Sequence, residues 1–431
     1  MNYAAALEFL DRHVNLEARA GKWEGLSLER MRDLAQVLGD PHEAFPAVHI
    51  TGTNGKGSTA RMVSRLVMAH GLSVGTYTSP HLERYNERIQ RNLEPVSDEE
   101  FAALIHDIAL VEALVDQPPS HFEVLTAAAF RHFADTAVDV GVVEVGVMGR
   151  WDATNIVHGQ VAVITNIGRD HTDFSGDWRR AIASEKAGII KTGATLVLGE
   201  SNPALREVFL AEGQERTLVR GEHFRLLANR LAVGGRLLSI ETPRGRVEEL
   251  FVPLHGAHQG ENAALAVVAA EEFFDRPLDP EVAAEAFAEL TVPGRFEVME
   301  RQPLVILDGA HNPDGAEAAA AVLAEEFAQV AGRRIFVIGM LTGRDPETML
   351  RAFGVRSDDR LITTTPPSPR ALPAEELADT ARRLGLQAEA VHEVPDALDR
   401  ARYTSRTDDL ILVTGSLYVV GAARAALAGD G

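Results

Sequence analysis

A glycine-rich segment between an expected strand and an expected helix has the composition of a phosphate-binding loop. In HITGTNGKGSTARM (49–62), Lys56 and Ser58 stand on either side of Gly57. Glycines allow backbone N–H groups to converge on a phosphate, and a helix N-terminus adds positive potential. Lys56 would contact the terminal phosphates of a nucleotide, with Ser58 close by. Because Gly57 stands where the usual motif has a hydroxyl residue, a glycine turn that binds no ligand is the alternative.

Two further segments place polar side chains after apolar strands. Glu144 lies near a strand end in VVEVGVMGRWDATN (142–155), and His171 follows the next strand in TNIGRDHTDF (165–174). In an open α/β sheet, the carboxyl ends of the strands face the ligand crevice. Beside a phosphate loop, Glu144 is suited to bind Mg²⁺ through its oxygens. The alternatives are a carboxylate paired with a neighbouring group and a structural histidine, since Mg²⁺ seldom takes imidazole.

The fourth segment is ASEKAGIIK (183–191), which we expect to place Lys186 in the first part of a helix. The chain has only four lysines among its 42 basic residues. A lysine amine can lose its proton and be modified, which a guanidinium does not do. Glu185 would keep an unmodified ammonium charged unless other cations compete with it. A salt-bridged surface lysine is the alternative.

These segments need an open sheet to position them. Short apolar runs alternate with helical stretches, which predicts an α/β fold with a mainly parallel sheet and helices on both faces. The stretch 223–252 alternates with period two around glycine-containing turns, and it predicts a small antiparallel meander. The expected strands are 46–51, 73–78, 138–145, 161–167 and 194–199, and the expected helices are 58–71, 98–116, 121–136, 260–275 and 279–290.

A second α/β domain is expected after a hinge at TVPGRFE (291–297), which contains Pro293 and Gly294. Strand–helix alternation starts afresh beyond it, as in a Rossmann-like domain. We therefore predict a domain 1–294, with a P-loop-type sheet, and a domain 295–431. The strands expected in the second domain are PLVILD (303–308), RRIFVIGM (333–340), RLITTT (360–365) and DDLILVTG (408–415).

The composition limits the classes of function. The 431 residues carry a formal charge of −21 and include no cysteine. The acidic balance argues against a general nucleic-acid binder, and the lack of cysteine excludes thiolate metal sites and cysteine nucleophiles. No apolar run approaches the roughly 18 residues of a membrane span, and the N-terminus does not read as a signal peptide. We expect a cytoplasmic protein with no membrane or nucleic-acid partner.

Taken together and in this order, the four segments resemble the folylpolyglutamate synthase family of the Mur ligase superfamily, which includes bifunctional dihydrofolate synthases. The resemblance covers nearly the whole chain. It implies an ATP-dependent ligase that adds L-glutamate to a folate or a dihydropteroate through an acyl phosphate, and relatives are typically monomers. The other similar segments are GLSLERMRDLAQVLG (25–39), TSPHLERYNERI (78–89), HFEVLTAAAF (121–130), PGRFE (293–297), DGAHNPDG (308–315) and VTGSLYVV (413–420).

The resemblance also implies site residues. Those expected to bind ATP are Gly52, Thr53, Asn54, Gly55, Lys56, Gly57, Ser58, Asn262, Arg295 and Asp308. Two Mg²⁺ ions are expected on Ser79, Glu144 and His171, and Lys186 is expected to be carbamylated. The expected substrate contacts are Ser120, Phe122, Glu123, Asp152, Ala153 and Ser416. Catalytic roles are implied for Lys56, Lys186 and His311.

The resemblance leaves two alternatives and one departure. Within the superfamily, a peptidoglycan-precursor ligase is the alternative, but its UDP-sugar domain is not expected because the phosphate loop begins near residue 51. A nucleotide-binding module without ligase activity is the alternative from another class. Met148 and Trp151 differ from the residues that relatives more often carry, which leaves the preferred folate open.

Overall fold

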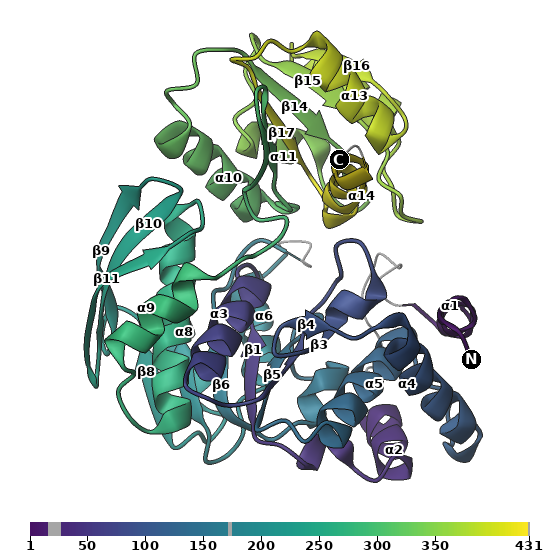
Figure 1. Cartoon of the computed structure of the whole chain (residues 1–431), viewed down its shortest axis with the longest axis vertical. Coiled ribbons are helices and arrows are strands. Elements are labelled where there is room, and N and C mark those ends of the chain that lie inside the picture. The colour runs from purple at the N-terminus through teal and green to yellow at the C-terminus, as the bar shows by residue number, and fades with distance from the viewer. Residues whose placement is uncertain (16–26, 171–174, 430–431) are drawn as a thin grey trace. The chain divides into compact units, whose positions relative to one another are not determined.

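The computed structural model describes residues 1–15, 27–170 and 175–429, and it divides into two units (Figure 1). The first unit comprises residues 1–232, 236–253 and 258–290. The second comprises residues 233–235, 254–257 and 291–431. Each unit is built on its own sheet and core.

The sheet of the first unit has eight strands in the order β4-β3-β2-β5-β1-β6-β7-β8. Six neighbouring strands pair in parallel, in the order β2, β5, β1, β6, β7 and β8. At one edge, β3 pairs antiparallel with β2, and β4 pairs antiparallel with β3. Both β1 and β5 are buried at every position, as expected of parallel strands covered on both faces. The bounds are β1 (Ala47–Thr51), β2 (Val74–Tyr77), β3 (Ile89–Arg91), β4 (Glu94–Pro95), β5 (Val140–Glu144), β6 (Gly159–Ile164), β7 (Thr195–Leu198) and β8 (Arg216–Val219).

Helices bury apolar side chains against this sheet in two clusters. One cluster includes residues of α1, α2, α4 and α5, and the other includes residues of β6, β7, α6 and α7. The helix bounds are α1 (Tyr3–Asp11), α2 (Glu29–Val37), α3 (Lys56–Ala69), α4 (Asp98–Val111), α5 (His121–Asp135), α6 (Trp178–Ala187), α7 (Arg206–Leu210), α8 (Ala257–Phe274) and α9 (Pro280–Ala288). Short 3₁₀ turns occur at Pro41–Glu43, Tyr85–Arg88, Glu112–Leu114, Ala153–Ile156 and Pro203–Leu205.

The predicted antiparallel meander is confirmed as a three-stranded sheet. Its strands are β9 (Arg225–Ala232), β10 (Gly235–Thr242) and β11 (Gly245–Val252), in the order β11-β10-β9. Gly234 and Gly245, at the two turns, have positive φ, which is why the chain can reverse there.

The second unit has a six-stranded sheet in the order β12-β13-β17-β14-β15-β16. Only β12 pairs antiparallel, and the other five strands run parallel, as in a Rossmann-like domain. The strand bounds are β12 (Glu297–Arg301), β13 (Leu304–Leu307), β14 (Arg334–Ile338), β15 (Arg360–Thr363), β16 (Gln387–Ala390) and β17 (Leu410–Thr414). The helices are α10 (Pro313–Glu326), α11 (Pro346–Ala352), α12 (Ala374–Arg383), α13 (Val394–Thr404) and α14 (Leu417–Gly429).

The predicted α/β fold class, with a parallel sheet, a meander and a second α/β unit, is confirmed. In the part of the chain that the structure describes, no helix is long and apolar enough to span a membrane.

Candidate active site

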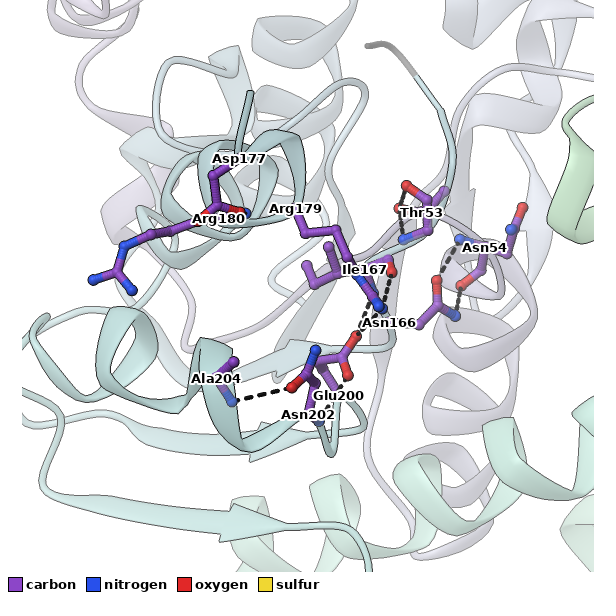
Figure 2. A network of polar contacts seen from close by, with 11 residues as sticks. Thr53, Asn54, Asn166, Ile167, Asp177, Arg179, Arg180, Glu200, Asn202 and Ala204 are labelled. Carbon is purple, nitrogen blue, oxygen red and sulfur yellow. Dashed lines mark hydrogen bonds and ion pairs between the residues drawn. The ribbon is translucent and has the colours of Figure 1, made fainter. Parts of the chain in front are cut away.

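The glycine-rich loop joins β1 to α3 and turns into the helix at Gly55. Gly55 has a φ of 84°, and a Cβ there would overlap Oδ1 of Asn262 on α8. Two loop N–H groups are held by the segment after β6: Thr53 donates to the Asn166 carbonyl at 3.1 Å, and Asn54 donates to Asn166 Oδ1 at 3.0 Å (Figure 2). The loop therefore has a fixed shape, and the predicted nucleotide residue Asn262 lies against it.

The segment after β6 is in turn clamped on both sides (Figure 2). Asn166 Nδ2 donates to the Asn54 carbonyl at 2.9 Å. On the other side, the Ile167 N–H donates to Glu200 Oε2 at 3.2 Å, and Arg179 donates to the Ile167 carbonyl at 3.2 Å. The phosphate loop is thus anchored through one polar network to the chain that follows β7.

Lys56 opens α3 and folds back over the loop. Its Nζ donates to the carbonyls of Gly52 and Thr53 at 3.1 and 3.3 Å. Lys186 Nζ donates to the same Gly52 carbonyl at 2.8 Å. Carbonyls carry only partial charge, so neither ammonium is neutralised by these contacts. Two of the four lysines of the chain therefore meet at one oxygen atom, and Ser58 is buried on the first turn of α3.

Lys186 lies in the last turn of α6, and the expectation that it stands in the first part of a helix was wrong. The helix begins at Trp178, where Asp177 caps it by accepting the Arg180 N–H at 3.2 Å. It ends at Gly188. The side-chain cap sets the start of the helix about one turn earlier than the motif alone indicated.

Burial and, to a smaller extent, the nearby Lys56 ammonium lower the pKa of Lys186 to about 7, while Asp170 and Asp152 oppose this. The side chain of Lys186 is buried. Glu185, which the sequence suggested would hold the ammonium, has its own pKa raised by burial. The amine therefore loses its proton readily, and the competing cation is Lys56.

Glu144 and Ser79 meet at the carboxyl ends of the adjacent parallel strands β5 and β2. The Ser79 N–H donates to Glu144 Oε2 at 3.1 Å, and a Cβ on Gly57 would lie 3.3 Å from the same oxygen. Ser79 Oγ is shielded from solvent and has no hydrogen-bond partner among the described residues. A carboxylate beside an unpaired hydroxyl is a donor set that suits a hard cation such as Mg²⁺.

The third expected ligand, His171, lies outside the described residues. Within residues 1–15, 27–170 and 175–429, no three His, Cys, Asp or Glu side chains gather as a metal site. The pair formed by Ser79 and Glu144 does not form such a group, because it contributes one carboxylate and one serine hydroxyl. A serine hydroxyl can nevertheless bind a hard cation through its oxygen.

Two of the expected folate contacts shape the start of α5. Ser120 and Glu123 form a capping box: Glu123 accepts the Ser120 N–H at 2.6 Å, and Ser120 Oγ accepts the Glu123 N–H at 3.3 Å. Phe122, on the same turn, lies against the loop after β5, since a Cβ on Gly146 would be 2.5 Å from its ring. Of these three side chains, Phe122 is the one not engaged in capping the helix.

Asp152 organises the loop after β5. Its carboxylate accepts the N–H groups of Val147 at 2.9 Å and Thr154 at 3.0 Å, and the Thr154 hydroxyl at 2.5 Å. Burial raises the pKa of Asp152, and these hydrogen bonds oppose the increase. His49 Nε2 lies 3.0 Å from the Thr154 hydroxyl. Ala153, the neighbouring expected contact, belongs to the apolar core.

Sequence reasoning missed His49 as a partner of this loop. Burial lowers its pKa to about 3, so its ring is neutral and can donate to the Thr154 oxygen while the hydroxyl donates to Asp152. The residue stands in the expected strand just before the glycine loop, where its type fits none of the motif positions, and only its place inside a buried strand could have marked it.

In the second unit, the expected residues gather at the ends of the neighbouring strands β13 and β17. Asp308 accepts the N–H groups of Phe296 at 3.1 Å and Ala310 at 3.0 Å. Burial raises the pKa of Asp308, and the Arg295 guanidinium opposes this. A Cβ on Gly309 would overlap Arg295 Nη1, so the guanidinium lies over this turn.

His311 and Ser416 complete this cluster. His311 Nδ1 lies 2.9 Å from the Gly309 carbonyl, an arrangement that orients the imidazole ring. Ser416 Oγ accepts the Val419 N–H at 3.3 Å, at the start of α14. The loops carrying them are joined by a hydrogen bond from the Gly415 N–H to the Ala310 carbonyl at 3.1 Å.

Comparisons with known proteins agree on one family. Residues 50–270 match the profile of the Mur ligase middle domain, and residues 294–417 match that of the Mur ligase glutamate ligase domain. The dihydrofolate synthase/folylpolyglutamate synthase of Mycobacterium tuberculosis is 40% identical over 92% of this chain and 89% of its own length. The folylpolyglutamate synthase of Lacticaseibacillus casei is 33% identical over 100% of this chain and 99% of its own length.

Solved structures agree as well. Mycobacterium tuberculosis folylpolyglutamate synthase complexed with ADP and AMPPCP superposes with a TM-score of 0.90 at 38% identity, over 99% of both chains. The Escherichia coli protein in complex with DHPP and ADP gives 0.86 at 30% identity, over 100% of this chain and 98% of the other.

Proposed function

The chain belongs to the folylpolyglutamate synthase family of the Mur ligase superfamily, and from this membership we propose that it uses ATP to join L-glutamate to a folate. Because several similar relatives carry both activities in their names, we propose dihydropteroate as a second acceptor. The observation that carries the proposal is the meeting of Lys56 and Lys186 at the Gly52 carbonyl, in the same loop whose Gly57 lies beside Glu144.

The phosphate loop, residues 52–58, is proposed to bind the phosphates of ATP. A carboxylate of the folate would attack the γ-phosphate, giving an acyl phosphate and ADP. Both reactants are anions, so Lys56 would reduce the repulsion between them. We assign further nucleotide contacts to Asn262, Arg295 and Asp308 on the basis of the family resemblance.

Mg²⁺ would be held by Ser79 and Glu144, and we propose His171 as a further ligand. When bound, the ion supplies positive charge beside the transferring phosphoryl oxygens. The support from this chain is the pairing of a buried carboxylate with a shielded hydroxyl that has no partner among the described residues.

Lys186 is proposed to react with CO₂. The neutral amine forms an N–C bond, the amine proton leaves to solvent, and a carbamate anion replaces the ammonium. A pKa of about 7 supports this, since an ordinary lysine is almost wholly charged at neutral pH. The carbamate would then be a carboxylate-like group near Lys56.

The remaining assignments rest on the family. We propose that the folate lies against Phe122 and the loop of Asp152 and Ala153. Ser120 and Glu123 would contribute by capping α5, the helix that carries Phe122. His311 and Ser416 are assigned to the glutamate side. There, the amine of L-glutamate attacks the acyl phosphate and phosphate leaves. The cytoplasmic location and the monomeric state stay predictions.

Product analysis tests the proposal. The protein is incubated with ATP, Mg²⁺ and L-glutamate, with dihydropteroate and tetrahydrofolate as separate acceptors. The expected result is glutamate-dependent phosphate release, with a product heavier by one glutamyl residue for each acceptor used. ATP binding without any such release would instead support a nucleotide-binding module. Release that requires another amine or another acid would support a different amide ligase of the superfamily.

A further inference from the structure

We propose that Asn155 and Lys191 are positioning residues that couple the folate loop to the turn carrying Lys186. The inference rests on the proposed function, because it takes the loop of Asp152 and Ala153 as the folate side. It adds two residues to which the family resemblance gave no role. Their hydrogen bonds form one continuous chain between the two segments.

Asn155 bridges the two segments with a single side-chain amide. Its Nδ2 donates to the Arg150 carbonyl at 2.9 Å and to the Gly188 carbonyl at 2.9 Å. Arg150 lies two residues before Asp152, and Gly188 lies two residues after Lys186. Both N–H groups of the amide are therefore used to hold the folate loop against the end of α6.

Lys191 fixes Asn155 in this position. Its Nζ donates to both the backbone carbonyl and Oδ1 of Asn155, each at 2.8 Å. The amide orientation follows, because Oδ1 faces the ammonium and Nδ2 must face the two carbonyls. A lysine suits this role, since its compact ammonium can reach two oxygens of one residue, whereas a guanidinium presents a wide planar fork.

Direct packing adds to the hydrogen bonds. The Arg150 N–H donates to the Glu185 carbonyl at 2.8 Å. A Cβ on Gly188 would lie 2.5 Å from Arg150 Cα, and one on Gly149 would lie 3.1 Å from Lys186 Cα. The two backbones are in close contact, so a shift of the folate loop displaces the turn of Lys186.

Coupling of this kind is reciprocal. If an occupied folate loop favours the backbone position that suits the Lys186 carbamate, then the carbamate strengthens folate binding by the same factor. Asn155 and Lys191 carry this coupling, but within the described part of the chain their hydrogen bonds reach neither the phosphate loop nor the pair formed by Ser79 and Glu144. Their loss should therefore change the coupling and leave nucleotide affinity unchanged.

The test measures dihydropteroate affinity by calorimetry, with and without saturating bicarbonate, and follows the carbamate carbon by NMR with ¹³C-bicarbonate. In the wild type, bicarbonate should tighten dihydropteroate binding by roughly 5- to 150-fold, the usual range for coupled sites. In Lys191→Met and Asn155→Ala, that factor should fall toward one, with ATP affinity unchanged. The double variant should be no worse than the worse single variant, because both remove the same link.

Arg216→Met is the matched control, since it removes a basic side chain that pairs with Glu272 at 2.9 Å elsewhere in the same unit. It should keep the wild-type bicarbonate factor. A second measurement uses the wild type alone, so that it does not depend on whether the variants fold. Dihydropteroate should slow amide hydrogen exchange in residues 183–190. The coupling would be overturned if the variants keep the full increase in dihydropteroate affinity that bicarbonate causes. It would also be overturned if dihydropteroate leaves the exchange rates of residues 183–190 unchanged. A wild type that shows the coupling but makes no glutamylated product would overturn the proposed function alone.

Discussion

At the scale of single residues, the central feature is that Lys56 and Lys186 donate to one carbonyl oxygen, that of Gly52. Two ammonium groups this close repel each other, which is one reason why Lys186 releases its proton near pH 7. Among the described residues, Lys56 Nζ donates to the backbone carbonyls of Gly52 and Thr53, which do not neutralise its charge, so this charge can act on an anion. The two lysines are chemically alike but are placed for different tasks.

Lys56→Ala should reduce activity by about 10²- to 10³-fold, the typical cost of removing one group that stabilises transition-state charge. The fold should be kept, because the lost hydrogen bonds end on carbonyls of a loop that Asn166 still holds. Turnover and thermal unfolding are measured together. Near wild-type turnover in a variant of unchanged melting temperature would remove the phosphate assignment.

Glu144→Gln should weaken Mg²⁺ activation sharply, because it removes a charge and keeps the side-chain shape. The Mg²⁺ concentration for half-maximal activity is compared between the wild type and the variant. Gln can still accept the Ser79 N–H through its amide oxygen, so the local backbone should be unchanged. Identical Mg²⁺ titrations would mean that the carboxylate has a structural role.

Lys186→Met should stabilise the CO₂-free protein most at low pH. In the wild type, the folded-state pKa is about 7, below the unfolded value of about 10.4. Folding therefore carries the cost of a buried ammonium in full below pH 7, and this cost disappears as the pH rises toward 10. Denaturant unfolding of both proteins from pH 6 to pH 9.5 checks this. A stability difference independent of pH would show that Lys186 is not perturbed.

At the scale of elements, helix termini set the site. Gly55 begins α3, Ser120 and Glu123 cap α5, and Asp177 caps α6. Each cap fixes where a functional side chain emerges. The cap of α3 differs from the others, because a left-handed glycine rather than a side chain begins the helix, which keeps the N-terminal N–H groups open to an anion.

Gly55→Ala should lower ATP affinity and destabilise the protein by about 1–3 kcal/mol. The methyl would be strained at positive φ and would also overlap Asn262 Oδ1. Gly71→Ala is the control, since its φ is 92° and no atom lies within 4 Å of the added Cβ. It should show the strain but keep ATP affinity. Equal ATP affinities in the two variants would contradict the role of the loop.

At the scale of the whole molecule, the chain is strongly acidic yet is proposed to take anionic substrates. Its formal charge is −21, while ATP and folates are negative too. Local cations in the site must therefore work against an unfavourable overall field. The long-range repulsion is screened by salt, whereas contacts in a buried site are screened far less.

The KM for the folate should therefore fall as monovalent salt rises from about 10 mM to about 150 mM, where the Debye length shrinks from about 30 Å to about 8 Å. Steady-state kinetics at fixed Mg²⁺ measure this. A neutral osmolyte at matched osmolarity is the control and should leave the KM unchanged. A KM that rises steadily with salt would show that local positive charge dominates over the net charge.

Much of the fold could be predicted because its signals are local. Buried parallel strands such as β1 and β5 appear as apolar runs, and the meander appears as period-two alternation with glycine turns. The edge strands β8 and β16 were not predicted, and β16, with the sequence QAEA, has no apolar pattern. Its strand form depends on pairing with β15, which no local pattern reports.

The sequence by itself determined which residue types could do chemistry: a glycine loop with Lys56, a carboxylate at a strand end, and a rare lysine. Only the tertiary structure decided that Lys186 ends its helix, that burial and Lys56 lower its pKa, and that Asn155 and Lys191 join the two segments beside it. Spacing along the chain encodes local geometry. Burial, charge proximity and long-range hydrogen bonds depend on residues more than 30 positions apart, and the fold alone brings these together.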